Sequence, residues 1–149
     1  MKWINKFMLT LGLVIPSLHL YAVQSGIPPV PPLYLAIYES ARKGNEAETE
    51  FYLSSLEQEK PKIQKTILQN IIDQIICNPN EEITSQQRIF LANQEIIKKH
   101  IQATNPEIMD KVLQKQKWTV ASDLLTCGYF PQTPTGRNLF YNIPHLSSE

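Results

Sequence analysis

The side chains that could act as nucleophiles or bases are two cysteines and a few histidines. Cys77 and Cys127 are the cysteines, and His100 and His145 are the histidines beyond the N-terminal segment. A cysteine nucleophile needs a base within hydrogen-bond reach and a third group that orients the base. Cys127 and His145 could form such a pair, but a structural thiol and a histidine in a loose tail explain the same pattern. His100 lies in a lysine-rich segment typical of a helix end, so we expect no catalytic residue here.

The other residues capable of chemistry form no recognisable ligand set. Acidic residues gather at 46–50 and 81–82, near predicted helix starts, where the helix dipole favours them. Two thiols without histidines at ligand spacing do not make a zinc site. The five glycines form no phosphate-binding loop. We therefore expect no metal ion, no cofactor and no enzymatic activity, while a site assembled in space from distant residues stays open.

Cys77 and Cys127 also permit a structural pairing. In an oxidising compartment, a disulfide between them would close a loop of ~50 residues and stabilise the fold by roughly 4 kcal/mol. Two buried free thiols are the alternative, because cysteine is among the most buried residue types. The sequence does not say whether the two Cα atoms lie within bridging distance. Both interpretations stay open.

The N-terminal segment has the pattern of an export signal. Lys2 and Lys6 precede a short apolar core over Phe7–Ile15, and Ala22 is a small residue suited to cleavage. A retained membrane anchor is the alternative, but the apolar run is shorter than the roughly 20 residues that a spanning helix needs. We therefore expect a signal peptide over residues 1–22 and a periplasmic or secreted mature protein.

The charge balance argues against two classes of partner. Without residues 1–22 the chain holds 12 basic and 14 acidic residues, a net charge of about −2. Nucleic-acid binding requires a basic patch, and membrane-surface binding favours a basic amphipathic helix. We therefore expect no nucleic acid and no membrane span after signal cleavage.

The chain beyond the signal divides into a leader, one domain and a tail. Four prolines in residues 23–32 predict an extended leader, either a spacer or a ligand for an aromatic groove. Residues 33–146 form the predicted single helical domain, and residues 147–149 a loose tail.

Helical periodicity dominates the domain. Isoleucines between Ile63 and Ile76 recur at spacings that build one wide apolar face, whereas a strand would place half of them in water. Prolines, capping residues and the turn Lys43-Gly44-Asn45 separate the helices. Six helices are predicted, beginning at Leu33, Glu46, Pro61, Thr84, Asn105 and Trp118. The fold class is therefore all-α, a domain of stacked helical hairpins that bury their apolar faces against neighbours.

The same patterns assign individual positions. Thr84 and Gln87 form a predicted capping box that opens a helix whose buried face continues to Ile101. The apolar faces also include three large residues that we expect to be buried: Phe51, Ile63 and Trp118.

The order of elements over Asn105–Tyr141 resembles one ankyrin repeat. Leu124-Leu125-Thr126-Cys127-Gly128 matches the leucine-rich end and glycine stop of the second ankyrin helix. Thr135-Gly136-Arg137 is similar to the glycine turn that begins the next unit. The resemblance is partial over Ala36–Leu53.

Several residues depart from the ankyrin pattern. The Thr-Pro-Leu-His box is absent, and Asn138-Leu139-Phe140-Tyr141 stands in its place. Gln116 replaces the glycine expected between the paired helices. Helices over Pro61–Ile101 are too long for ankyrin units. An unrelated helical domain with similar glycine and proline positions is therefore the alternative to a degenerate repeat protein.

The resemblance implies an ankyrin-like short α-solenoid with a surface that binds another protein. In that family the loop after the second helix carries contacts, and here this loop is residues 128–137. Rigid aromatic side chains and arginine dominate interface energies, so the candidate partner-binding residues are Tyr129, Phe130, Arg137 and Tyr141. We expect Tyr129 and Arg137 at the surface and Phe130 folded over the preceding helices.

These observations favour an exported, non-enzymatic helical adaptor that binds a protein partner. An accessory subunit of a cell-envelope or secretion assembly is one such role. The alternatives are a small exported enzyme or effector whose site is not visible in the sequence, and an inhibitor that acts by occlusion.

Overall fold

The computed structural model describes residues 31–143, and within this range the protein is all-helical, without strands. This confirms the predicted all-α class. The predicted signal peptide, most of the leader and the tail lie outside the described residues. The helices are α2 (Pro32–Arg42), α3 (Glu46–Leu56), α4 (Pro61–Ile71) with its π-helical continuation η1 (Ile72–Ile76), α5 (Ser85–Ala92), α6 (Glu95–Thr104), α7 (Ile108–Gln114), α8 (Trp118–Thr126) and α9 (Pro134–Tyr141).

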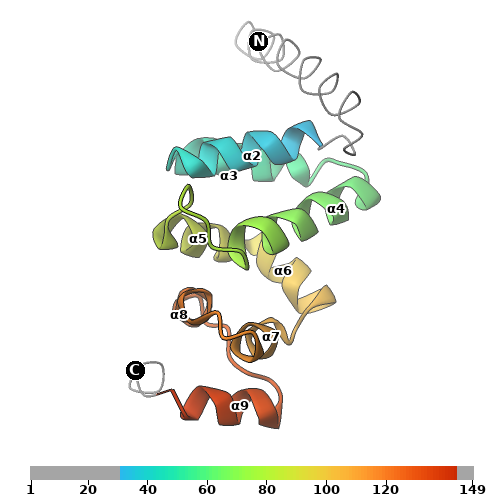
Figure 1. The fold of residues 1–149 in the computed structure, drawn as a ribbon. Coiled ribbons are helices and arrows are strands. Elements are labelled where there is room, and N and C mark those ends of the chain that lie inside the picture. Colours follow the sequence, from blue (N-terminus) through green and yellow to red (C-terminus); the bar gives the residue numbers. More distant parts are fainter. Residues whose placement is uncertain (1–30, 144–149) are drawn as a thin grey trace, which may run out of the picture.

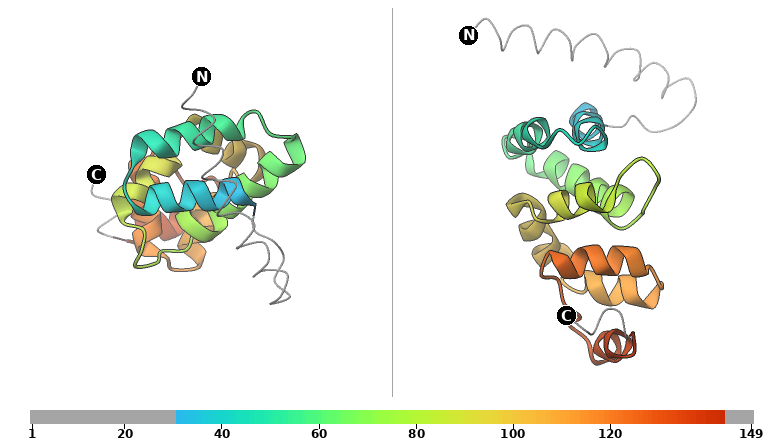
Figure 2. Two further views of the ribbon diagram at one scale, coloured as in Figure 1. Left: turned by 90° about the horizontal axis from the view of Figure 1, so that it is seen from above. Right: turned by 90° about the vertical axis from the view of Figure 1, so that its left-hand side faces the viewer.

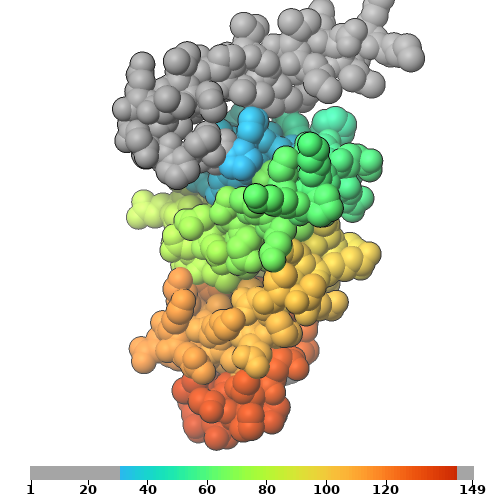
Figure 3. Space-filling model, turned by 90° about the vertical axis from the view of Figure 1, so that its right-hand side faces the viewer, coloured from blue at the N-terminus to red at the C-terminus, as the bar shows by residue number. Residues whose placement is uncertain are grey.

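The helices form successive layers along one direction (Figure 1). Helices α2 and α3 make the first layer, α4 and α5 the next, and α7 and α8 a third, with α6 between the second and third (Figure 2). Helix α2 contacts α4 and α5, α5 contacts α8, and α7 contacts α9 at the end. The space-filling view shows the same order as a column (Figure 3). None of the helices in residues 31–143 has the length and apolar character needed to cross a membrane.

Three helices end in the same left-handed turn. The residues with positive φ are Gly44 after α2 (69°), Gln116 after α7 (56°) and Gly128 after α8 (84°). In each turn, the next residue's N–H bonds to the carbonyl five positions earlier: Asn45 to Ser40, Lys117 to Val112, and Tyr129 to Leu124. This is the Schellman cap, which satisfies carbonyls left free at a helix end. Gln116 thus adopts the left-handed conformation although it is not a glycine.

Several predicted helix starts are confirmed. Pro61 is the first residue of α4, and Thr84 with Gln87 forms a complete capping box at α5. Pro32, which the sequence places in the leader, is the first residue of α2. The start expected at Asn105 is wrong, because Asn105 closes α6 and α7 begins at Ile108.

The single helix predicted from Thr84 to Ile101 is in fact two helices. Gln94 has an extended backbone (ψ 132°) and separates α5 from α6. In one straight helix, Leu91 and Ile97 would point about 120° apart, yet both are fully buried. The change of direction lets each helix bury its own apolar side.

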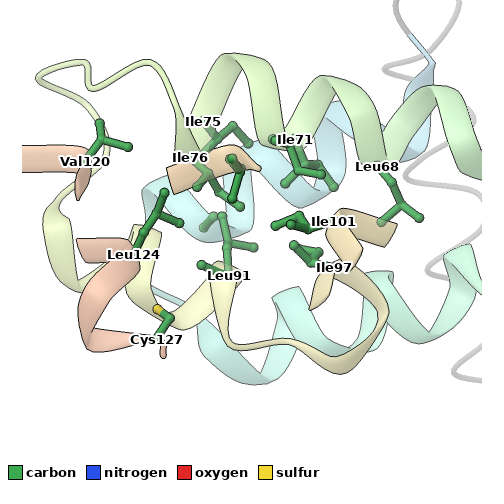
Figure 4. Packing of buried hydrophobic residues seen from close by; sticks show 14 of the residues in the cluster. Leu68, Ile71, Ile75, Ile76, Leu91, Ile97, Ile101, Val120, Leu124 and Cys127 are labelled. Atoms are coloured by element: carbon green, nitrogen blue, oxygen red, sulfur yellow. The ribbon is translucent and has the colours of Figure 1, made fainter. Parts of the chain in front are cut away.

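One continuous apolar core runs through the described helices. Figure 4 shows isoleucines of α4, η1 and α6 meeting Leu91 of α5, with Leu124 of α8 and Cys127, which follows α8, beside them. Each fully buried aliphatic side chain contributes about 1.5–3 kcal/mol. Three expectations of burial are wrong, since the exposed fractions are 59% for Phe51, 41% for Ile63 and 36% for Trp118.

A buried ion pair joins α5 to α8. Arg88 Nε donates to Asp123 Oδ2 over 2.8 Å. The guanidinium also donates to the Ile83 carbonyl at 2.8 Å and to the Ser85 hydroxyl at 2.9 Å. A buried pair is tolerated when its remaining hydrogen-bonding groups are satisfied. The guanidinium therefore links two layers without leaving an uncompensated charge in the core.

Candidate functional site

Helix α9 is attached to α7 through the carboxylate of Asp110. This side chain is buried and accepts hydrogen bonds from the Gln132 N–H at 2.8 Å and the Thr133 N–H at 2.9 Å. The Thr133 hydroxyl donates a third bond over 2.6 Å. The carboxylate therefore fixes the end of the α8–α9 loop just before α9 begins.

Asp110 is held in its charged form. Burial by itself would raise the pKa of Asp110, but hydrogen bonds from the Thr133 hydroxyl and from the Gln132 and Thr133 N–H groups outweigh burial and lower it. Hydrogen bonds to a carboxylate stabilise its ionised form. A negative charge at the start of α9 also complements the helix dipole.

Gly136 allows this close approach. A Cβ atom on Gly136 would lie 1.8 Å from Asp110 Oδ1, which no real contact allows. The Gly136 N–H donates to the Thr133 hydroxyl at 3.0 Å, so Thr133 caps α9 while it bonds Asp110. We call Asp110, Thr133 and Gly136 the α9 joint. The joint is not among the residues predicted from the sequence, although Thr133-Pro134 is a typical N-cap and first-turn proline.

The two aromatic residues of the loop have the reverse of their expected orientations. Tyr129 packs against the core, and its hydroxyl donates to the Ala92 carbonyl at 3.0 Å. Burial raises the pKa of Tyr129 to about 12, so it stays a hydrogen-bond donor. Phe130, which we expected over the helices, is 56% exposed. Tyr129 therefore pins the loop, and Phe130 is the aromatic residue available to a partner.

The outward side of α9 carries the other two candidates. Arg137 and Tyr141 lie four residues apart and so share one helix face. Arg137 is exposed and donates from Nη1 to the Gln132 carbonyl at 2.9 Å. Tyr141 is 70% exposed and meets Phe140 edge to face. We call Phe130, Arg137 and Tyr141 the α9 surface.

Both cysteines are free thiols in the structure. Cys77 is half-buried, and buried Cys127 donates from Sγ to the Ile89 carbonyl at 3.5 Å. Burial raises the pKa of each thiol to about 11. Both therefore stay protonated near neutral pH, the unreactive form of cysteine. The candidate base His145 lies outside the described residues.

The other histidine beyond the N-terminal segment is part of a helix contact. His100 Nε2 lies 3.4 Å from Gln69 Oε1, which joins α6 to α4. Burial, followed by the charge of Lys65, lowers the pKa of His100. Among residues 31–143, no group of three or more His, Cys, Asp or Glu side chains is placed to hold a metal ion.

No protein-family model, no curated protein and no solved structure matches this chain.

Proposed function

We propose that this protein is an exported helical adaptor that binds a protein partner through the α9 surface. The observation that carries the proposal is that the start of α9 is fixed to α7 while the α9 surface is exposed to solvent. The α9 joint holds the start of the helix by three hydrogen bonds to one buried carboxylate. Phe130 and Tyr141 nevertheless remain largely in solvent.

The exposed groups are of the kind that contribute most to interfaces. Aromatic rings and arginine provide large contact areas at low entropic cost. The Gln132 side-chain amide donates to the Phe130 carbonyl at 3.1 Å, and Arg137 donates to the Gln132 carbonyl. Loop and helix are therefore tied together before binding, which reduces the cost of ordering them against a partner.

An ankyrin-like architecture is part of the proposal. Its support is the Schellman cap that recurs after α2, α7 and α8, together with the layered order of the helices. Gln116 takes the left-handed position where the ankyrin pattern has a glycine. Export rests on the charged and apolar pattern of residues 1–22. An accessory role in a cell-envelope or secretion assembly follows from compartment and binding surface together.

The test is a double substitution, Phe130→Ala with Tyr141→Ala. Tagged wild-type and variant proteins are purified from their native cells, and copurifying proteins are quantified by mass spectrometry. Both side chains are exposed, so we expect an almost unchanged melting temperature. Capture of the main partner should fall by about tenfold or more, which corresponds to roughly 1.4 kcal/mol.

Ile63→Ala is the matched control, because Ile63 is also an exposed apolar residue but lies on α4. We expect this variant to capture the partner as the wild type does. Undiminished capture by the double variant would place the interface elsewhere. If the melting temperature and the partner capture both fell, the two rings would be needed for the stability of the fold and not specifically for binding.

A further inference from the structure

A groove of about 290 Å³ lies where η1, the end of α6 and α7 meet. It shares no residue with the α9 surface. Its walls include one carboxylate, one thiol and three ammonium groups, from Asp73, Cys77, Lys111, Lys115 and Lys117. Positive charge therefore predominates in this groove, although the chain as a whole has a formal net charge of zero.

The three lysines are not neutralised by neighbouring carboxylates. Lys111 Nζ donates to Asn105 Oδ1 at 2.6 Å, and Lys117 Nζ donates to the Cys77 carbonyl at 2.7 Å. The Lys115 side chain makes no hydrogen bond or ion pair with the described residues. The ion pairs of residues 31–143 all lie outside the groove. Two ammonium groups are thus held in position by neutral oxygens, and each keeps further N–H groups for a ligand.

The Asp73 carboxylate accepts hydrogen bonds from a side-chain amide. Asp73 accepts from Gln69 Nε2 at 3.0 Å and 3.1 Å through its two oxygens. Asp73 therefore contributes a negative charge beside the lysines without pairing with any of them. A compact anion attracted by the lysines would therefore also meet the negative charge of Asp73. An extended peptide can direct its carboxylates to the lysines and leave its neutral backbone beside Asp73.

The wall that carries Asp73 has unusual backbone geometry. Residues Ile72–Ile76 form a π-helix, and the Cys77 N–H bonds to the Ile72 carbonyl at 2.8 Å. Such turns are rare and often occur at functional sites. The π-helical segment provides Asp73 and is followed by Cys77, whose carbonyl orients Lys117.

We propose that this groove binds an acidic peptide segment of a protein partner. Its side-chain carboxylates are held by the ammonium groups of Lys111, Lys115 and Lys117. Charge complementarity carries the assignment, because three unpaired cations converge on one cavity. The site is independent of the α9 surface, so either one can fail without the other.

The experiment measures fluorescence anisotropy of a labelled hexaglutamate peptide titrated with the full-length chain at low ionic strength. We expect saturable binding that weakens as salt is added, because salt screens exposed charges. Lys115→Glu reverses one charge without breaking a hydrogen bond, and should weaken binding by about tenfold or more. Asp73→Asn should strengthen it.

Lys43→Glu is the control, since it makes the same charge change on the exposed turn between α2 and α3. Its affinity should stay within about twofold of the wild type. Equal weakening by the two reversals would mean general charge attraction and would overturn the proposal. Absence of saturable binding would also overturn it. So would displacement of the peptide by equimolar inorganic phosphate, which would show a site for small anions.

Discussion

Gln116 occupies a backbone position that the chain gives to glycine in its two equivalent turns. A left-handed conformation costs a residue with a Cβ roughly 1–2 kcal/mol. The turn between α7 and α8 nevertheless keeps both hydrogen bonds of the Schellman cap. Packing of the two helices therefore imposes a conformation that Gln116 alone would avoid.

Replacement of Gln116 by glycine should stabilise the protein. Glycine reaches the left-handed region without the Cβ penalty, although its unfolded state is more flexible. The net gain in the free energy of unfolding should be about 0.5–1 kcal/mol. Urea denaturation followed by circular dichroism measures it.

Gly128→Ala is the reverse experiment. A Cβ on Gly128 has no atom within 4 Å, so only the φ of 84° is unfavourable. A loss of about 1 kcal/mol is expected. If Gln116→Gly destabilised the protein, the Gln116 side chain would have to contribute a contact that outweighs the backbone strain.

Tyr129 and Phe130 show what residue types alone leave undecided. Both rings could cover the core or face solvent, and the turn at Gly128 decides which one points inward. Tyr129 can donate to the Ala92 carbonyl, whereas Phe130 has no polar atom for that acceptor. The acceptor lies 37 residues away in sequence, so the sequence pattern could not reveal it.

At the scale of the elements, α9 is held by a close contact with α7. Its first turn is attached to α7 at the α9 joint, where Gly136 touches Asp110. Because the contact is so close, Gly136 cannot be replaced by a residue with a side chain unless Asp110 moves.

Gly136→Ala should therefore release α9 from the stack. The added Cβ must displace the Asp110 carboxylate, which breaks hydrogen bonds in a buried place and costs about 1–3 kcal/mol. Hydrogen exchange should show faster exchange of the α9 amides and unchanged protection in α4 and α5. Thr135→Ala, at an exposed neighbouring position, should leave α9 protected. Unchanged protection in Gly136→Ala would mean that Asp110 is not what holds α9.

The helix boundaries show where sequence patterns were sufficient. Proline at Pro61 and the capping box at Thr84 act through their nearest neighbours, so they were correctly predicted. The break at Gln94 has no proline or glycine and results from tertiary packing. The one local sign of this break is that the helical periodicity of the apolar residues changes between Leu91 and Ile97. At α9, the sequence contains the N-cap Thr133, but the resemblance to an ankyrin repeat places this residue in a loop.

At the scale of the whole molecule, stability depends on the apolar core shared by the layers. Ile72 lies at the junction of α4 and η1 and is 1% exposed. No described carboxylate or amide is left unsatisfied in the buried interior. A new charge there would find no free polar partner.

Ile72→Asp should abolish cooperative unfolding. An unpaired buried charge costs several kcal/mol, a large part of the roughly 5–15 kcal/mol that stabilises a domain. Thermal circular dichroism should show a broad, shallow transition. Ile63→Asp, at a partly exposed position on the same helix, should melt almost as the wild type does. A sharp native-like transition for Ile72→Asp would contradict this description of the core.

The order of layers along the column has a consequence for how the chain folds. Each layer contacts mainly the layers next to it in sequence, so few contacts require distant segments to meet. Folding rates rise as contacts become more local, and helical proteins of this kind fold in microseconds to milliseconds. Synthesis proceeds at roughly 5–20 residues per second, so each layer has time to settle on its predecessor before the next emerges. The Asp110 carboxylate would then stay solvated until α9 is synthesised and packs against α7.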